Sequence, residues 1–422
     1  MSKIEITNHA NINYEANKKL GYYLLGDKIY YNKFHALVDE AKQSEHEVKW
    51  FFNEDKLFRV NWTVEPDADI RELYRQRAQQ LRDTYDYIRL ECSGGSDSAT
   101  VAYAFLLNGI HLDEVVFRYP KAGEKGLVGN AFDLSCENTL SEWEFAAKPL
   151  LDWISTKHPT TKITIHDYTE DMLADEDTRD ESWIFKTRHF LQPGHYAKHK
   201  LTDAHKKLND QGSKVCVLFG IDKPKVCIKD DKFWLYFTDQ PTGENDPDLG
   251  GYTNMTNEYF FWSPDLPELL VKQAHIIKNW FMMPQNHKMQ SLLRWPNGNF
   301  ATRTIYEQAI KSIIYPDYDS NTFQVVKSTN NIHNEMDYWF HTNFKDTQSH
   351  RIWEAGINYL LDNVNDRHIG YRQNRAMDLT VFQSPFYYIG ECYIPVVSPV
   401  VATKAQKDTV YKHLINNQLV IY

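Results

Sequence analysis

Hydrophobic and polar positions follow two alternating periods through the middle of the chain. Short apolar runs typical of buried strands are separated by stretches with the 3.6-residue period of amphipathic helices. The runs predict strands at 87–92, 114–119, 162–168 and 214–219. The stretches predict helices at 70–85, 98–107, 138–157 and 196–209. Strands that alternate with helices indicate the α/β class, with a parallel sheet flanked by helices on both faces in a doubly wound arrangement.

Turn and cap residues mark the limits of these segments. Asp67 or Asp69 is placed to cap the helix at 70–85, and Asn108-Gly109 to end the helix at 98–107. Two later apolar runs, at 226–229 and 232–237, are separated by a pair of aspartates and predict a hairpin.

The regions before and after this α/β segment have different hydrophobic patterns. Residues 1–65 contain short aromatic runs, a helical stretch near 33–44 and apolar runs at 48–52 and 57–62 that predict strands. From about Ser263, a helix over 264–282 opens a mostly helical, aromatic-rich segment. We therefore expect a small N-terminal α+β region (1–65), an α/β domain (66–262) and a mostly helical C-terminal domain (263–422).

Composition excludes several classes of protein. The 422 residues are 42% hydrophobic and 14% aromatic, which supports packed cores and excludes global disorder. The net charge of −10 argues against a protein that coats nucleic acid, although it leaves a local basic groove open. The sequence shows neither an apolar signal segment nor a run of about 20 apolar residues that could span a membrane. The five cysteines are odd in number and form no C-x-x-C pair, which predicts a reduced, cytoplasmic protein without a zinc or iron–sulfur site.

The strongest chemical feature is a small-residue turn between the first predicted strand and the following helix. Its residues are Ser93, Gly94, Gly95, Ser96, Asp97 and Ser98. The two glycines let the backbone turn sharply and approach a ligand closely, and the helix that follows presents free N–H groups and a positive dipole end to phosphates. The serines add hydroxyl donors. The spacing differs from G-x-x-x-x-G-K-[ST], so the turn is not an ordinary nucleoside-triphosphate loop.

The pattern S-G-G-x-D-S after an apolar strand resembles the signature of the PP-loop ATP pyrophosphatases. This family includes asparagine synthetase, GMP synthetase, NAD synthetase and the 7-cyano-7-deazaguanine synthases. The likeness in element order covers roughly residues 70–260. It implies a HUP-like sheet in the order 3-2-1-4-5, ATP at the carboxyl ends of the strands with the turn on its pyrophosphate portion, and Mg²⁺-assisted attack on the α-phosphate. A substrate carbonyl or carboxylate would become an adenylate, pyrophosphate would leave, and a nucleophile would displace AMP.

Further candidates lie at the ends of the other strands. Asp97 and Asp222 are candidate Mg²⁺ ligands, since a carboxylate beside phosphates repels its ligand unless a metal or a proton-bearing partner intervenes. Lys223 follows the fourth strand and could neutralise the departing pyrophosphate, which makes it a catalytic candidate together with Asp97. An ordinary strand-capping turn at 220–224 is the alternative. Phe117 and Arg118 end the second strand, where such sheets hold adenine through backbone groups, or they are plain strand-end residues.

Weaker features leave two interpretations open in each case. His195 and His199 have the spacing of metal ligands on one helix face, but no third ligand is apparent. The acidic run at 171–181 is a metal site or a solvated loop, and 243–251 is a substrate lid or a surface turn. A basic set near the C-terminus either binds an anionic substrate or ATP phosphates or forms a solvated basic face. It consists of Arg367, His368, Arg372 and Arg375.

The nitrogen source is constrained by what the sequence lacks. Residue 2 is Ser and no cysteine lies near the start of the sequence, so we expect the chain to lack the N-terminal-nucleophile glutaminase of asparagine synthetase. Free ammonia, an amine substrate or a separate nitrogen-donating enzyme would then supply the nucleophile to an asparagine-synthetase-like ligase. The alternatives are a phosphoadenosine-phosphosulfate-reductase-like or sulfur-transfer enzyme, for which Cys392 is the candidate thiol, and a nucleotide-binding protein without turnover.

Overall fold

A five-stranded parallel sheet forms the centre of the molecule. The computed structural model describes residues 18–126, 140, 142–169, 203–239, 254–294, 300–319, 339–371 and 377–393. The sheet runs in the order β10-β7-β4-β5-β6, with all neighbours parallel. Its strands are β4 (Tyr87–Glu91), β5 (Glu114–Arg118), β6 (Lys162–His166), β7 (Val215–Phe219) and β10 (Met255–Tyr259). Numbered along the chain, this is the order 3-2-1-4-5, so the predicted α/β class is confirmed, as are the four strands predicted for it.

The fifth strand, β10, has a polar sequence that the hydrophobic pattern does not identify. Glu258 in this strand is buried, and it can be buried because its carboxylate is hydrogen-bonded to Arg77, at 3.1 Å from Nη2, and to Lys19 and Tyr85. The strand is thus held in the sheet by paired charges as well as by apolar contacts.

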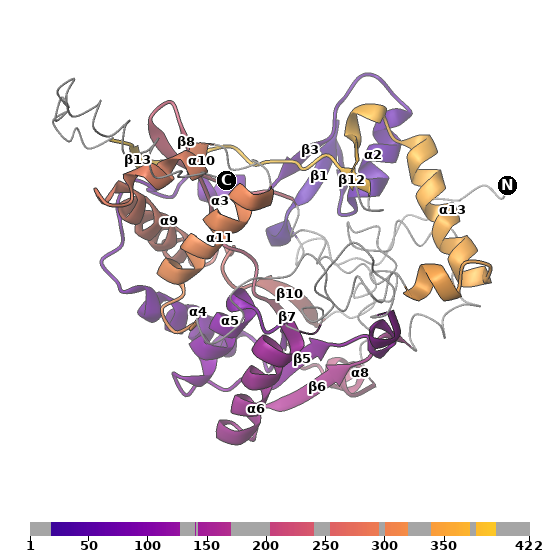
Figure 1. Cartoon of the computed structure of the whole chain (residues 1–422), viewed down its shortest axis with the longest axis horizontal. Helices are drawn as coiled ribbons and strands as arrows, with labels where there is room; N and C mark the ends of the chain where they lie inside the picture. Colours follow the sequence, from indigo (N-terminus) through magenta and orange to yellow (C-terminus); the bar gives the residue numbers. More distant parts are fainter. Residues whose placement is uncertain are drawn as a thin grey trace, which may run out of the picture.

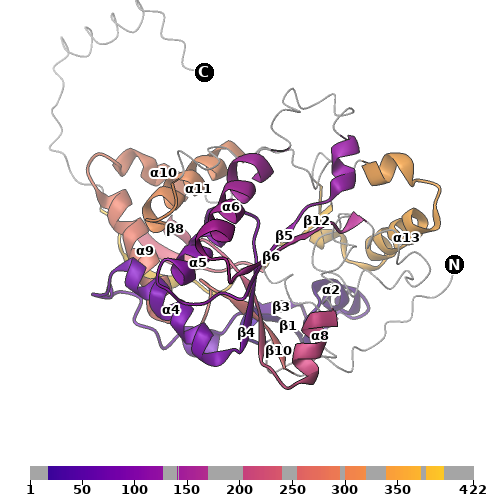
Figure 2. The same ribbon diagram turned by 90° about the horizontal axis from the view of Figure 1, so that it is seen from below.

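Helices cover both faces of the sheet (Figure 2). On one face lie α4 (Ile70–Thr84), α5 (Ser96–Leu106) and α6 (Lys148–Lys157), and on the other lies α8 (Asp203–Asp210). The Asp69 carboxylate caps α4 by accepting the Arg71 N–H at 2.8 Å, one of the two capping aspartates expected from sequence. Gly109, with φ +67°, follows α5 as expected. A π-helix (Trp143–Ala147) leads into α6, and the 3₁₀-helix η2 spans Lys121–Gly126.

The N-terminal region is α+β, but one expected strand is wrong. The antiparallel sheet β2-β1-β3 is built from β1 (Tyr22–Leu25), β2 (Lys28–Tyr30) and β3 (Lys49–Phe51), with η1 (Lys18–Leu20) and α2 (Lys33–Ala41) beside it. The run at 57–62 is not a strand: it begins as the end of the short helix α3 (Glu54–Leu57) and continues as turns. The Trp62 indole N–H donates to the Leu57 carbonyl at 2.9 Å and folds the segment back, while Phe58 stays 61% exposed.

The predicted hairpin is present and receives a third strand from the C-terminal region. β8 (Lys225–Lys229) and β9 (Lys232–Tyr236) are joined by Asp230 and Asp231, both with φ 52°, as a primed turn requires. β13 (Tyr387–Glu391) pairs antiparallel with β9. The described part of the C-terminal region is otherwise mostly helical, as expected. It contains α9 (Pro267–Met282), η9 (His287–Gln290), α10 (Ser291–Arg294), α11 (Phe300–Ile314), α13 (Gln348–Asn363), η10 (Asp366–His368), β11 (Ile369–Tyr371) and β12 (Met377–Leu379).

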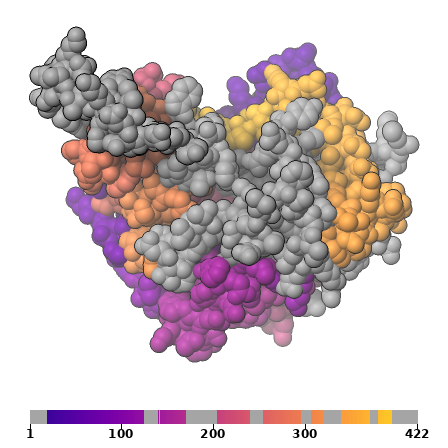
Figure 3. All heavy atoms as spheres, viewed as in Figure 1, coloured from indigo at the N-terminus to yellow at the C-terminus, as the bar shows by residue number. Residues whose placement is uncertain are grey.

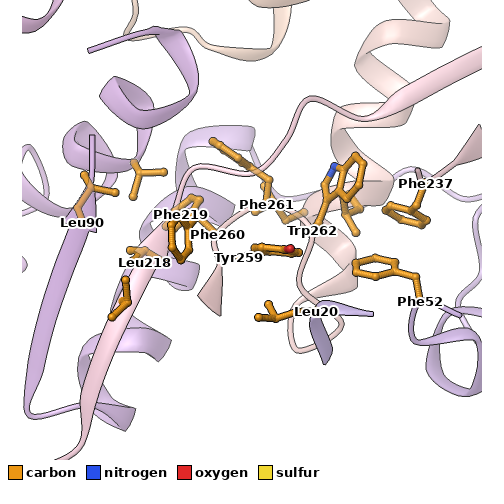
Figure 4. Close-up of a cluster of buried hydrophobic side chains, with 14 of the residues drawn as sticks. Leu20, Phe52, Leu90, Leu218, Phe219, Phe237, Tyr259, Phe260, Phe261 and Trp262 are labelled. Atoms are coloured by element: carbon orange, nitrogen blue, oxygen red, sulfur yellow. The ribbon is translucent and has the colours of Figure 1, made fainter. Parts of the chain in front are cut away.

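The hydrophobic core is continuous across both expected domain boundaries. After β10, the aromatic run from Tyr259 leads from the sheet towards the N-terminal region (Figure 4). Its last member, Trp262, packs against Phe52 at 5.9 Å and Phe237 at 5.0 Å between ring centroids. Phe237 in turn packs on Tyr387 of the C-terminal region at 6.0 Å, so the three segments are packed on one another through shared aromatic contacts.

The N-terminal and C-terminal regions also meet. α13 lies beside α2 in Figure 1, and the N-terminal and C-terminal colours adjoin on the surface in Figure 3. α9 and α11 lie together on the side of the molecule that carries α4. Within the ranges given above, no helix has the length and apolar character needed to cross a membrane.

Candidate functional site

The turn between β4 and α5 depends on Gly94 for the packing of the fold itself. Gly94 has φ +75°, a conformation that residues with a Cβ rarely adopt. A Cβ built on it would lie 2.4 Å from Cα and 2.5 Å from N of Ala147, at the end of the π-helix. The missing side chain therefore lets the backbone of the π-helix rest directly on the turn.

Gly95 differs from its neighbour, because nothing in the described fold requires glycine there. Its φ of −68° and ψ of 167° suit any residue, and a Cβ would meet only the Ser93 hydroxyl at 3.4 Å. Gly95 is the N-cap of α5. The helix N-terminus therefore has no side-chain cap, which is the arrangement that phosphate-binding turns use.

The three serines of the turn have different environments. The Ser98 hydroxyl is buried and donates to the Gly95 carbonyl at 3.2 Å, so it braces the turn. The Ser96 hydroxyl is also buried, and no residue that the structure describes offers it a hydrogen bond. Ser93 is exposed, and its hydroxyl accepts the Gly95 N–H at 3.4 Å. Of the three hydroxyls, that of Ser93 is the one accessible to a ligand.

A second segment is pressed against the start of α5. A Cβ on Gly220, just after β7, would lie 2.9 Å from the Ser98 nitrogen and 3.0 Å from the Asp97 carbonyl carbon. Glycine at this position allows the backbone leaving β7 to pass directly over the first turn of the helix. This close approach brings the next residues, Asp222 and Lys223, to Asp97.

The two segments meet in a cluster of four charges. Lys223 Nζ lies 2.7 Å from Asp97 Oδ2 and 3.5 Å from Asp222 Oδ1. Lys225 Nζ lies 2.8 Å from Asp222 Oδ2. Two carboxylates are thus balanced by two ammonium groups. The structure brings together Asp97, Asp222 and Lys223, the residues predicted to hold Mg²⁺ and pyrophosphate, and adds Lys225.

The cluster keeps Asp222 and Lys223 ionised. Burial by itself would raise the pKa of Asp222, but the charges of Lys225 and Lys223 outweigh it and hold this pKa well below its usual range. Burial would lower the pKa of Lys223, but the carboxylates of Asp97 and Asp222 outweigh it and raise this pKa above its usual range. At neutral pH Asp222 is therefore a carboxylate and Lys223 an ammonium group.

Asp222 should make folding stability dependent on acid. Because its pKa is lower in the folded than in the unfolded chain, its contribution is fully present above the unfolded pKa of about 4 and is lost as pH falls towards the folded pKa. Asp222→Asn is expected to flatten the fall in unfolding free energy between about pH 4 and pH 2. Urea titrations across this range measure the slope, and equal slopes in the two proteins would contradict the ion pairing of Asp222.

The carboxylates offer only part of a metal site. The described residues contain no group of three or more His, Cys, Asp or Glu side chains that could hold a metal ion. Asp97 and Asp222 contact the same ammonium group, and Mg²⁺ is commonly held by one or two carboxylates together with substrate phosphates. The residues therefore fit Mg²⁺ if a bound phosphate supplies the other oxygen ligands.

Phe117 and Arg118 lie at the same edge of the sheet as the turn. The Cys92 N–H donates to the Val116 carbonyl at 2.9 Å, which sets the ends of β4 and β5 side by side. Phe117 is 3% exposed and packs on Trp143, with ring centroids 5.2 Å apart. The Arg118 guanidinium lies 4.8 Å from the centroid of the Tyr168 ring. Since both side chains have packing roles, the contact to adenine stays a prediction about their backbone groups.

Two residues of the predicted basic set connect the C-terminal region to the N-terminal region. Arg367 lies 3.0 Å from the Glu40 carboxylate of α2 and 2.6 Å from that of Glu47. His368 Nε2 lies 2.5 Å from Glu40. His368 is buried with Glu40, whereas Arg367 is half exposed and pairs with both glutamates, so the pair links the N-terminal and C-terminal regions and a role toward an anionic ligand stays a prediction. Arg372, Arg375, His195, His199, the acidic run 171–181 and the expected lid 243–251 lie outside the described residues.

The thiol of Cys392 does not suit redox chemistry. Cys392 is buried, and its Sγ lies 3.4 Å from the Gln290 amide oxygen. Burial raises the pKa of this thiol, whereas reactive cysteines are exposed and have lowered pKa values. This environment weighs against a reductase that uses Cys392.

Two residues of the site are not identified by sequence analysis. Lys225 is three residues after Asp222 and two after Lys223, a spacing that could have suggested it. Tyr315, which donates a hydrogen bond to Asp97 Oδ1 from a position 218 residues later in the chain, has no local pattern that could have indicated it.

The scan of the sequence against models of protein families finds no match, and neither does the search among curated proteins. A function for the site therefore rests on its residues, their geometry and the resemblance of the turn to the PP-loop signature.

Proposed function

We propose that this chain binds ATP at residues 93–98 and cleaves it between the α and β phosphates. In this proposal it adenylates a carboxylate or carbonyl oxygen, releases pyrophosphate and transfers the activated group to a nitrogen nucleophile. The observation that carries the proposal is the position of Lys223, whose Nζ lies 2.7 Å from the carboxylate of Asp97 on the uncapped first turn of α5.

Three features support a phosphate ligand. The N-terminus of α5 offers backbone N–H groups and the positive end of the helix dipole. Gly95 leaves space for a ligand to reach them. Lys223 places an ammonium group beside this end of the helix, Lys225 pairs with the neighbouring Asp222, and an ammonium group binds phosphate well as a point charge.

The lysines also suit pyrophosphate as the leaving group. When the bond between the α-phosphorus and the bridging oxygen breaks, negative charge builds up on that oxygen. A fixed ammonium group beside it lowers the barrier because it needs no reorganisation at that moment. Mg²⁺ bound with ATP would supply further charge neutralisation, and Asp97 and Asp222 are the residues that would hold it. The likeness of S-G-G-S-D-S to the PP-loop signature agrees with this bond as the one that is cleaved.

The substrate oxygen would attack the α-phosphorus and form an adenylate. The nitrogen nucleophile, which is an amine, ammonia or ammonia delivered by a separate enzyme, would then displace AMP. In this proposal Lys223 would bind the departing pyrophosphate, Asp97 would orient Lys223, and Ser93 would donate its hydroxyl to a phosphate oxygen. The protein is proposed to act in the cytoplasm.

Gly95→Ala separates ligand binding from folding. The change is expected to lower the free energy of unfolding by no more than about 1 kcal/mol, the usual cost of alanine at an N-cap, because φ and the local space accept a methyl group. ATP affinity is expected to fall at least about tenfold, since the methyl group would stand where the phosphates approach the helix end. Isothermal titration calorimetry with MgATP measures the affinity, and unchanged binding would show that phosphate does not sit at Gly95.

The products formed from ATP test the proposed reaction. AMP and pyrophosphate support it, ADP and phosphate indicate a different cleavage, and binding without products indicates a nucleotide-binding protein. Loss of the reaction in a Lys223 variant connects it to this site.

A further inference from the structure

Tyr315 brings the C-terminal region to the turn. It directly follows α11, its side chain is 1% exposed, and its ring packs on Phe261 with centroids 5.5 Å apart. Its hydroxyl donates a hydrogen bond to Asp97 Oδ1. A residue from the last third of the chain thus contacts a turn that belongs to the central sheet.

The position of Tyr315 is fixed by helix α4. The Ile314 carbonyl accepts the Tyr74 hydroxyl at 2.7 Å. Arg71, one turn earlier in α4, donates to the Asp317 carboxylate at 2.9 Å and to the Pro316 carbonyl at 3.3 Å. The backbone on both sides of Tyr315 is therefore held by α4, while its side chain extends to α5.

Because of this contact, each carboxylate oxygen of Asp97 has its own partner. Tyr315 binds Oδ1, and Lys223 binds Oδ2 at 2.7 Å. A carboxylate held at both oxygens has little rotational freedom, and its Oδ2 fixes the place of the Lys223 ammonium group. Burial, with the Asp97 charge beside it, raises the pKa of Tyr315 well above its usual range, so the hydroxyl stays a donor at neutral pH.

We propose that Tyr315 is a positioning residue of the ATP site: it holds Asp97, and through Asp97 it holds Lys223 in place for the phosphates. This inference rests on the proposed function. It also gives the C-terminal region a role, because the central sheet without residues 300–319 would lack one of the two groups that orient Asp97.

A double-mutant cycle tests whether Tyr315 acts through Asp97. The four full-length proteins are wild type, Tyr315→Phe, Asp97→Ala and the double variant. Phenylalanine keeps the ring contact with Phe261 and removes only the hydroxyl. MgATP affinity by calorimetry and the unfolding equilibrium constant from urea titration are measured for each protein, and AMP formation is followed where it occurs.

Tyr315→Phe alone is expected to weaken MgATP binding about tenfold, in keeping with the loss of a hydrogen bond to a charged group. In the Asp97→Ala background the same change is expected to have no further effect on binding, and a much smaller effect on the unfolding constant than in wild type. Tyr306→Phe is the matched control. Tyr306 is a buried tyrosine of α11 whose hydroxyl lies 3.2 Å from the Val226 carbonyl, and its loss should leave MgATP affinity unchanged.

The possible failures are distinguishable. If wild type binds MgATP and Tyr315→Phe binds it equally well, the positioning role is wrong while the proposed function stands. Additive effects in both measurements would also overturn the positioning role, because Tyr315 would then act independently of Asp97. If wild type does not bind MgATP, the proposed function fails, whatever the unfolding data show.

Discussion

Lys223→Met is expected to slow the formation of AMP and pyrophosphate by about 100- to 1000-fold, the range found when one preorganised donor to a developing negative charge is removed. Methionine keeps most of the length and volume of lysine but carries no charge. The ammonium group that it removes lies 2.7 Å from Asp97 and beside the uncapped end of α5. Initial rates at saturating MgATP measure the effect.

Lys229→Met serves as the control for this change. Lys229 ends β8 on the same hairpin and is exposed, and its ammonium group lies over the Phe386 ring at 5.5 Å, away from the charge cluster. Its replacement should leave the rate unchanged. A Lys223→Met protein that is folded by circular dichroism and retains more than about a tenth of the wild-type rate would contradict a catalytic role for Lys223.

Gly94→Ala is expected to destabilise the fold by about 3 kcal/mol or more. The new methyl group would combine an unfavourable φ of +75° with an approach of 2.4 Å to the backbone of Ala147. Since the opposing atoms belong to a helix backbone and not to a flexible side chain, they cannot move aside without shifting the π-helix. Urea unfolding measures the loss.

Gly109→Ala is the matched comparison. Gly109 has φ +67°, and no atom lies within 4 Å of the position of its Cβ, so alanine there carries the backbone cost of about 1–2 kcal/mol without the clash. Equal losses for the two variants would show that the π-helix does not rest on Gly94. Together with Gly95→Ala, these two variants test whether Gly94 serves packing and Gly95 serves ligand access.

Sequence analysis predicts the central sheet well because the fold and the local pattern agree there. Every residue of β7 is buried, so the strand appears as an unbroken apolar run. The hairpin turn at Asp230 and Asp231 is likewise encoded by residues that tolerate positive φ. Where polar residues are buried through long-range pairs, as Glu258 is in β10, the pattern fails because the partners are distant in sequence.

In the candidate site, too, the parts encoded by local motifs are predicted and the parts that depend on tertiary packing are not. The turn and the residues after β7 are identified because the carboxyl ends of parallel strands share one edge of a sheet, so short motifs after two strands come together. The close approach of Gly220 to Ser98 explains why the two motifs are in direct contact. This approach depends on backbone packing that no local pattern specifies. Tyr315 depends on the tertiary placement of α11 against α4, and the different roles of Gly94 and Gly95 depend on where the π-helix lies.

The most direct test is the bond of ATP that the protein cleaves. The full-length protein is incubated with Mg²⁺, a mixture of small-molecule carboxylates and amines, and ATP labelled in separate reactions at the α or the γ phosphate. Label from the α position is expected in AMP and label from the γ position in pyrophosphate, both at least about 100-fold faster than with Lys223→Met. Label from the α position in ADP together with free phosphate from the γ position, or AMP formed equally fast by Lys223→Met, would contradict cleavage between the α and β phosphates at this site.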